Sequence, residues 1–95
     1  MTYEVEISPA ATAEIDAAYA WLLERTPQHA PEWYNRALDA MLSLADNPAR
    51  CPFDDRAADT HKLLFGDKRH AYRIIFRIRG NTVHVLHVRH GARGD

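Results

Sequence analysis

The sequence has little cysteine, no long apolar run and no internal repeat, and each absence excludes a class of protein. Cys51 is the only cysteine among 95 residues, so no internal disulfide can form and a reducing compartment, the cytoplasm, is expected. No apolar stretch approaches the roughly 18 residues that a membrane-spanning helix needs. The start, MTYEVEISP, lacks the basic and apolar regions of a secretory signal. We expect Cys51 to be an inert loop thiol.

Size and composition predict one folded domain over residues 1–95. The chain is too short for a TIM barrel or a full Rossmann fold. Hydrophobic residues make up 46% and charged residues 26% of the sequence, which is typical of a folded domain and too apolar for a disordered chain.

The net charge of −1 conceals a strong asymmetry between the two halves. Residues 1–48 carry eight acids and two bases, whereas residues 49–95 carry ten bases and five acids. Five of the six histidines also lie after residue 60. This asymmetry indicates a basic working surface for a polyanion or an acidic partner. An ordinary solvated charged face is the alternative.

The first half predicts a strand and a helical hairpin. Residues 2–7 alternate between apolar and acidic, as in a half-exposed strand. Ser8-Pro9 is a typical helix start, and Thr26-Pro27 ends that helix. A second helix begins near Pro31 and runs to Asn47-Pro48, and the short connection predicts that the two helices are antiparallel.

After a loop over residues 49–60, the second half predicts three strands: 61–65, 71–79 and 82–89. Gly80-Asn81 is a tight-turn signature that joins the last two as a hairpin. The predicted fold is therefore α+β, in the order β-α-α-β-β-β, with the helical hairpin packed on an antiparallel sheet.

The strand 71–79 separates its side chains most clearly into two faces. Tyr72, Ile74 and Phe76 share the core face with Ile78, so Arg73, Ile75, Arg77 and Arg79 share the other. We expect Arg73 on a solvent or ligand face of a central strand. Three arginines on one face either bind something anionic or are simply solvated.

Three histidines near the C-terminus, His84, His87 and His90, have a spacing that suggests a metal site, but the alternation of side chains along a strand argues against one. Regular alternation places His84 and His90 on one face and His87 on the other, so the three cannot converge on one ion. The sequence therefore predicts no metal and no cofactor.

Two other kinds of function fit the basic half of the chain. Metal-independent RNA cleavage needs a base, cations for the pentavalent phosphate and an acid for the leaving oxygen. Arginine and histidine suit these roles, and the available residues are Lys62, Arg73, Arg77, His90 and Arg93. A non-catalytic basic binding module is equally compatible with the composition.

Several segments together resemble the RelE/ParE superfamily of bacterial toxins from toxin–antitoxin systems. They are Lys62-Leu-Leu-Phe65, Tyr72-Arg-Ile-Ile-Phe-Arg-Ile78, the Gly-Asn turn, and the ending Val83-His-Val-Leu-His-Val-Arg-His-Gly-Ala-Arg93. The resemblance covers the whole chain and implies the same β-α-α-β-β-β fold. It implies a growth-arresting, plasmid-stabilisation-like toxin that is neutralised by an antitoxin whose C-terminal segment wraps it.

The resemblance leaves two targets open. ParE-type members poison DNA gyrase, and we favour this target slightly; RelE-type members cut messenger RNA on the ribosome. For a ribonuclease, Arg73 matches a phosphate-binding arginine, Lys62 one of two basic residues on the preceding strand, and His90 lies close to a C-terminal histidine. The second basic position is Leu64 here, and the C-terminal helix and tyrosine of RelE are missing.

The resulting site predictions form three groups. If the chain is a ribonuclease, the catalytic residues are Lys62, Arg73, His90 and Arg93. The target-binding or nucleic-acid-binding residues are Arg73, Arg77, Arg79, Arg89, His90 and Arg93. The antitoxin-binding residues are Trp21, Tyr34 and Arg77, because an aromatic side chain left exposed on the helices would form part of an antitoxin groove.

Overall fold

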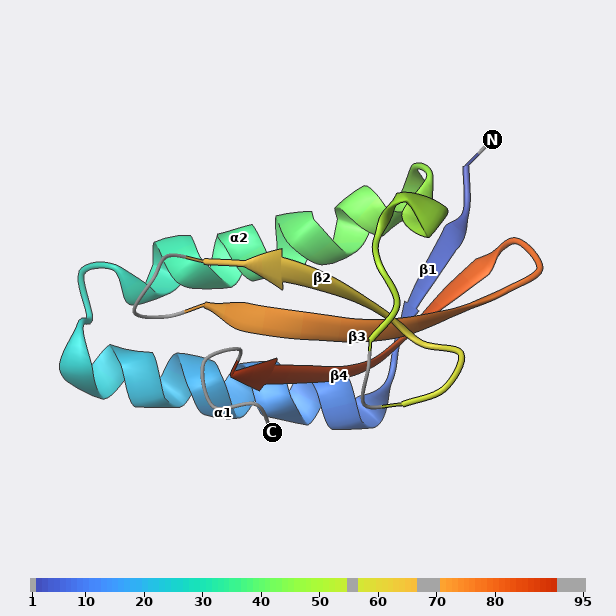
Figure 1. The fold of residues 1–95 in the computed structure, drawn as a ribbon. Coiled ribbons are helices and arrows are strands. Elements are labelled where there is room, and N and C mark those ends of the chain that lie inside the picture. Colours follow the sequence, from blue (N-terminus) through green and yellow to red (C-terminus); the bar gives the residue numbers. More distant parts are fainter. Residues whose placement is uncertain (1, 55–56, 67–70, 91–95) are drawn as a thin grey trace.

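A computed structural model describes residues 2–54, 57–66 and 71–90. Two antiparallel helices, α1 (Pro9–Arg25) and α2 (Ala30–Leu42), run along the sheet in Figure 1. The predicted helix start is confirmed, because the Ser8 hydroxyl accepts a hydrogen bond from the Ala11 N–H at 3.0 Å. The predicted stop at Thr26-Pro27 is confirmed as well.

The second helix is shorter than predicted. Its α-helical hydrogen bonding ends at Leu42, and the chain then tightens into two 3-10 helices, η1 (Ser43–Ala45) and η2 (Pro48–Arg50). Asn47 lies between them with a φ of 47°, in the left-handed region that asparagine tolerates better than most residues. Apolar periodicity does not distinguish this tighter winding from a continued α-helix.

The sheet has four strands in the order β1-β4-β3-β2. Their bounds are β1 (Glu4–Ile7), β2 (His61–Phe65), β3 (Tyr72–Arg79) and β4 (Thr82–His90). The strands β2, β3 and β4 pair antiparallel, and Gly80, with a φ of 59°, forms the predicted turn between β3 and β4. The predicted fold class and element order are confirmed.

The sheet is mixed rather than wholly antiparallel, because β1 pairs with β4 in parallel. A strand followed by a helical hairpin is not tied to its neighbour by a tight turn, so either direction is possible. The parallel pairing covers only residues 82–85 of β4. Beyond Val85, the outer edge of β4 is therefore contacted by α1 and not by β1.

A β-bulge in β4 changes which side chains share a face. Ile75 pairs with His87 and Phe76 with Val85, so Leu86 is an extra residue without a partner across the ladder. Ser8 holds this position, since its N–H donates to the Val85 carbonyl and its hydroxyl donates to the Leu86 carbonyl, both at 2.9 Å. The bulge moves every later residue of β4 to the opposite face.

The predicted assignment of the three C-terminal histidines to the two faces of the sheet is therefore wrong. His84 and His87 share one face, whereas His90 lies on the face that packs against the helices. The regular alternation assumed from the sequence is broken at Leu86.

The core lies between the helices and the sheet. The largest fully buried side chains include Phe76, Leu22, Met41, Leu44 and Ile74. Trp33 of α2 contacts Tyr72 edge-on, with ring centroids 5.0 Å apart, and joins the helical hairpin to the sheet. Among the described residues, no helix is both long and apolar enough to cross a membrane.

Candidate functional site: the open face of the sheet

The sheet face that is turned away from the helices gathers most of the predicted basic residues. We call it the open face; the register places on it Lys62, Leu64, Arg73, Ile75, Arg77, Arg79, His84, His87 and Arg89. It contains a hollow of about 340 Å³, lined by Asp54, Ala57, Thr60, Arg73, Ile75, Arg77, Leu86, His87 and Arg89. Its apolar lining residues are Ala57 of the loop, Ile75 of β3 and Leu86 of β4, and its charged ones include Asp54 and three arginines.

Arg73 lies on the predicted face but is not solvated. Its exposed fraction is 6%, as is that of Asp54 from the loop that crosses the open face. The loop is fixed by a hydrogen bond from the Asp54 N–H to the Thr60 carbonyl (2.8 Å) and by one from the Thr60 hydroxyl to the Ala57 carbonyl (2.7 Å). Alternation along a strand predicts the face of a residue but cannot predict how deeply that residue is buried.

The same loop is attached to the sheet through His61. The His61 ring stacks between Phe53 and Phe76, with centroid distances of 4.4 and 5.3 Å. His61 Nδ1 lies 2.8 Å from the Cys51 carbonyl oxygen, so this nitrogen carries the proton and donates it. The two ends of the loop, at Phe53 and His61, are therefore in contact with each other and with the sheet.

Glu14 of α1 holds the bulged part of β4 in place. Its carboxylate accepts a hydrogen bond from the Val88 N–H at 2.9 Å, at the edge that β1 does not reach. Both of its oxygens lie 3.3 Å from His87 Nδ1, and one lies 3.5 Å from Arg89 Nε. Glu14 thus satisfies an edge N–H and fixes two side chains of the hollow.

The hydrogen bond to Glu14 fixes the proton on His87. A carboxylate only accepts, so Nδ1 carries a hydrogen, and Nε2 is the ring nitrogen that takes no part in this contact. Arg89 Nη2, 3.4 Å from the same Nδ1, cannot donate to a nitrogen that carries a hydrogen, and the Arg89 side chain is held instead through Nε, 3.5 Å from Glu14. Sequence reasoning assigned no role to Glu14 or His87, although the spacing Val83, Val85, Val88 is a signal of the bulge.

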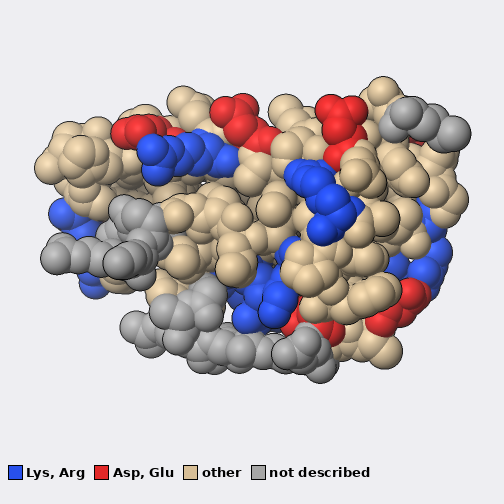
Figure 2. All heavy atoms as spheres, turned by 45° about the horizontal axis from the view of Figure 1, so that its top comes forward, with Lys and Arg blue, Asp and Glu red and all other residues tan. Residues whose placement is uncertain are grey.

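Asp59 neutralises the other end of the open face. Its carboxylate accepts a hydrogen bond from Arg79 at 2.7 Å and lies 3.9 Å from Arg77 Nε. The hydrogen bond from Arg79, together with the positive charges nearby, lowers the pKa of Asp59 below its ordinary value. On the face that Figure 2 shows, basic and acidic side chains of the described residues lie next to one another.

Two of the predicted catalytic residues do not reach the hollow. Lys62 is on the open face but lines a separate hollow of about 310 Å³ at the edge of β2, together with Arg50, Cys51, Pro52, Leu63 and Leu64. His90 faces the helices, where it lines a hollow with Ala18, Trp21 and Tyr72, and its ring meets Tyr72 edge-on at 5.1 Å. Arg93 lies outside the described residues.

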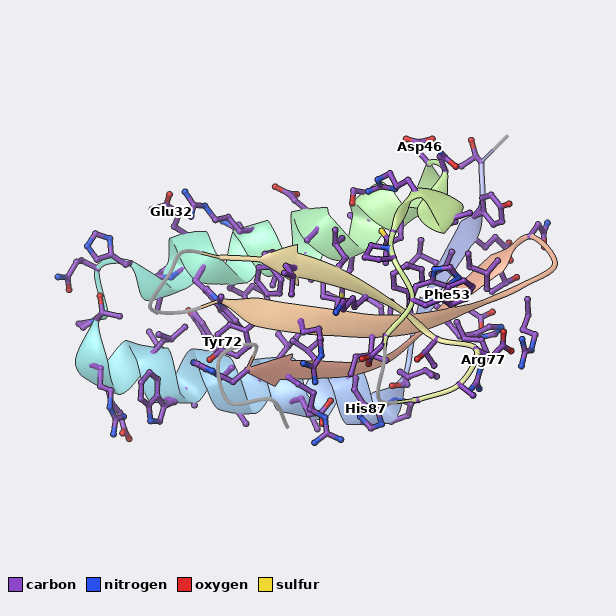
Figure 3. All side chains as sticks on the ribbon, viewed as in Figure 1. Glu32, Asp46, Phe53, Tyr72, Arg77 and His87 are labelled. Carbon is purple, nitrogen blue, oxygen red and sulfur yellow. The ribbon has the colours of Figure 1, made fainter. Side chains whose placement is uncertain are left out.

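The predicted antitoxin-binding residues lie on three different surfaces. Trp21 is 43% exposed on α1, with the Arg25 guanidinium 4.0 Å from its ring centroid. Tyr34 is half-buried between the helices, 5.0 Å from the Tyr19 ring. Arg77 is on the open face at the end of the sheet opposite Tyr72, as Figure 3 shows.

Cys51 is buried rather than exposed in its loop, and burial raises the pKa of its thiol. Such a thiol is a poor nucleophile at neutral pH. Within the part of the chain that the structure describes, no three His, Cys, Asp or Glu side chains are grouped so as to hold a metal ion.

Comparison with known proteins identifies the family. The model of the ParE toxin of type II toxin–antitoxin systems (parDE) matches residues 5–94. The chain belongs to this toxin family. The predicted membership of the RelE/ParE superfamily is therefore confirmed, and the protein is a type II toxin.

Individual relatives come from both branches of the superfamily. Toxin RelE1 of Caulobacter vibrioides is 31% identical over 91 residues, 96% of each chain. The chromosomal ParDE system of P. aeruginosa contains a chain of similar structure, with a TM-score of 0.80 at 15% identity over 94% of this toxin and 96% of that chain. The RelBE2 toxin–antitoxin complex of Mycobacterium tuberculosis also contains a chain of similar structure. Its TM-score is 0.61 at 22% identity, over 95% of this toxin and 99% of that chain.

Proposed function

We propose that this toxin arrests growth by binding DNA gyrase through its open face, without a catalytic step. The observation that supports this is the separation of the predicted ribonuclease residues: Lys62 lies at the edge of β2, Arg73 is buried, and His90 faces the helices. Acid–base catalysis requires its groups within hydrogen-bond reach of one reacting phosphate. Binding to a protein or protein–DNA target needs only complementary charge and shape.

The contacts to gyrase would come from the exposed arginines of the open face. Arg77, Arg79 and Arg89 are 35%, 56% and 39% exposed, unlike the buried Arg73. Each is paired with Asp59 or Glu14 within the chain, so its guanidinium is already oriented. A target that presents acidic groups would exchange with these carboxylates.

A cognate antitoxin is the second partner that we propose, with the toxin acting in the cytoplasm. The similar structures from P. aeruginosa and M. tuberculosis are toxin–antitoxin systems. Trp21, half-exposed on α1, and Tyr34 in the groove between the helices are the aromatic groups that an antitoxin segment would cover.

Induced expression in a bacterial host distinguishes the targets. We expect trapped gyrase–DNA complexes and filamentous cells, without cuts in ribosome-bound messenger RNA. The double variant Arg77→Ala/Arg89→Ala should lower the amount of trapped complex at least about tenfold, since a contact with a charged group contributes about 1.5–3 kcal/mol. Arg25→Ala/Arg36→Ala, which removes the same charge from the helices, is the control. Equal amounts from both double variants would refute the role of the open face.

A second function, RNA cleavage, is favoured by one specific observation. His87 lines the hollow with Arg73 and Arg77, with its Nδ1 hydrogen directed at Glu14 and its Nε2 outside that contact. In such a step Nε2 would take the proton of a ribose 2′-hydroxyl, the 2′-oxygen would bond to phosphorus, and the bond from phosphorus to the 5′-oxygen would break. The proton would then pass to that 5′-oxygen, leaving a 2′,3′-cyclic phosphate.

This second function has its own test. If the toxin cuts ribosome-bound messenger RNA, His87→Gln should abolish the cuts, whereas His90→Gln should retain them. Cuts that persist in His87→Gln would exclude His87 as the base. Absence of any cut by the unmodified toxin would exclude the function itself.

A further inference from the structure

Asp59 occupies the position that an acidic partner would take on the open face. It lies in the loop before β2 with a φ of 64°, a left-handed conformation that aspartate tolerates better than most side chains. The neighbouring Thr60 is buried and hydrogen-bonded within the loop. This anchoring holds the Asp59 carboxylate against the end of β3, while the carboxylate itself remains 61% exposed.

The pairing with Asp59 leaves one donor of the site unused. Arg79 donates to Asp59 at 2.7 Å, but Arg77 Nε, at 3.9 Å, is too far away for a hydrogen bond. This nitrogen is shielded from solvent and has no hydrogen-bond acceptor among the described residues. A buried donor without an acceptor is costly, so an additional oxygen in this place would be favourable.

We propose that Arg77 and Arg79 form a carboxylate-binding site for an acidic segment of the antitoxin, and that Asp59 is an internal competitor which this segment displaces. The Asp59 carboxylate is already bound by Arg79 at 2.7 Å, with Arg77 Nε 3.9 Å away. An incoming segment gains the Arg77 donor that Asp59 does not use. The inference rests on the antitoxin proposed above, but not on the choice between gyrase and messenger RNA.

The surroundings of the site favour an acidic protein segment over a nucleic acid. Asp54 lines the same hollow as Arg73, Arg77 and Arg89, and Glu14 lies beside it, 3.5 Å from Arg89. A phosphodiester strand, with a negative charge about every 3.4 Å, would bring phosphates against these carboxylates. A protein segment can place apolar side chains against Ile75 and Leu86 and one carboxylate on Arg77 and Arg79.

The inference is tested with the intact toxin and two labelled probes, without the antitoxin. One probe is a short peptide of alternating Glu and Leu, and the other is an oligothymidylate of the same charge; binding is followed by fluorescence anisotropy. Asp59→Asn keeps the size and the left-handed preference of residue 59 but removes its charge. Asp39→Asn, on the exposed side of α2, changes the net charge equally and is the control.

We expect Asp59→Asn to bind the peptide about two- to fivefold more tightly than the unmodified toxin, because exposed ion pairs are worth little. The gain should disappear when Arg79→Gln is added. Asp39→Asn should leave the affinity for the peptide unchanged. If Asp59→Asn and Asp39→Asn gain equally in affinity for the peptide, net charge alone explains the gain and the proposal is overturned. A gain in affinity for the oligothymidylate alone would show that the site binds a nucleic acid rather than an acidic protein segment.

These outcomes are independent of the proposed target. Absence of gyrase complexes in cells would leave the peptide measurement unaffected. Conversely, failure of the peptide measurement would not alter the induction experiment, which uses neither Asp59 variants nor an antitoxin.

Discussion

Replacing Glu14 tests the tertiary hydrogen bonds that hold α1 to the bulged edge of β4. In Glu14→Ala the Val88 N–H loses its acceptor beside a side chain that is only 4% exposed. A buried N–H left unpaired costs about 1–3 kcal/mol. Loss of the contacts to His87 and Arg89, both partly exposed, adds about 0.5 kcal/mol. The higher helix propensity of alanine returns a few tenths of a kcal/mol.

The expected sum is a loss of about 2–3 kcal/mol in the free energy of unfolding. For a domain of this size it corresponds to a fall of roughly 10–20 °C in Tm. Glu14→Gln should lose only about 0.5–1 kcal/mol, because the amide oxygen still accepts from Val88. Glu6→Ala, which removes an exposed carboxylate paired with His84, should change stability by less than about 0.5 kcal/mol.

Urea denaturation measures these differences, and hydrogen exchange locates them. The Val88 amide should exchange faster in Glu14→Ala than in Glu6→Ala, whereas the Val83 amide, in the part of β4 that pairs with β1, should retain its protection. If the free energies of unfolding of Glu14→Ala and Glu6→Ala differ by less than about 0.5 kcal/mol, the anchoring role of Glu14 is refuted. Equal losses for Glu14→Ala and Glu14→Gln would show that charge, rather than the Val88 hydrogen bond, dominates.

Two further predictions concern buried groups. Arg73→Ala should cost about 2–4 kcal/mol in urea denaturation, because Arg73 is buried, whereas Arg79→Ala should cost less than about 0.5 kcal/mol. Equal costs would contradict the burial. Stability should also fall as pH rises past about 9, because burial raises the pKa of Cys51 and Tyr72 in the folded chain above their ordinary 9.0 and 10.0. The unfolded chain then loses these protons first. Cys51→Ala/Tyr72→Phe should flatten this alkaline slope, and an unchanged slope would exclude these groups as its cause.

The secondary structure was largely predictable because its signals are local. Ser8-Pro9, Thr26-Pro27 and Gly80-Asn81 each restrict the backbone within a few residues, and the structure places element boundaries at all three. The α+β order follows from these boundaries. The parallel direction of β1 is not local, because it depends on how the helical hairpin returns the chain to the sheet.

The site was predicted less well because it depends on contacts between distant residues. Glu14 and His87 are 73 residues apart, and their contact requires the bulge at Leu86. The side chain of Arg73 has the predicted face, yet its burial depends on tertiary packing that no periodicity describes. Because of the same bulge, His90 lies on the face opposite the arginines. It therefore does not form the predicted catalytic group with Lys62 and Arg73.

Binding of the purified toxin to purified DNA gyrase tests the central claim most directly. We predict a complex whose affinity falls at least about tenfold in Arg77→Ala/Arg89→Ala, since these are contacts with charged groups. The affinity should remain unchanged in Arg25→Ala/Arg36→Ala and in His87→Gln, which keeps all the arginines of the open face. A toxin that shows no affinity for gyrase, with or without DNA, would contradict the account.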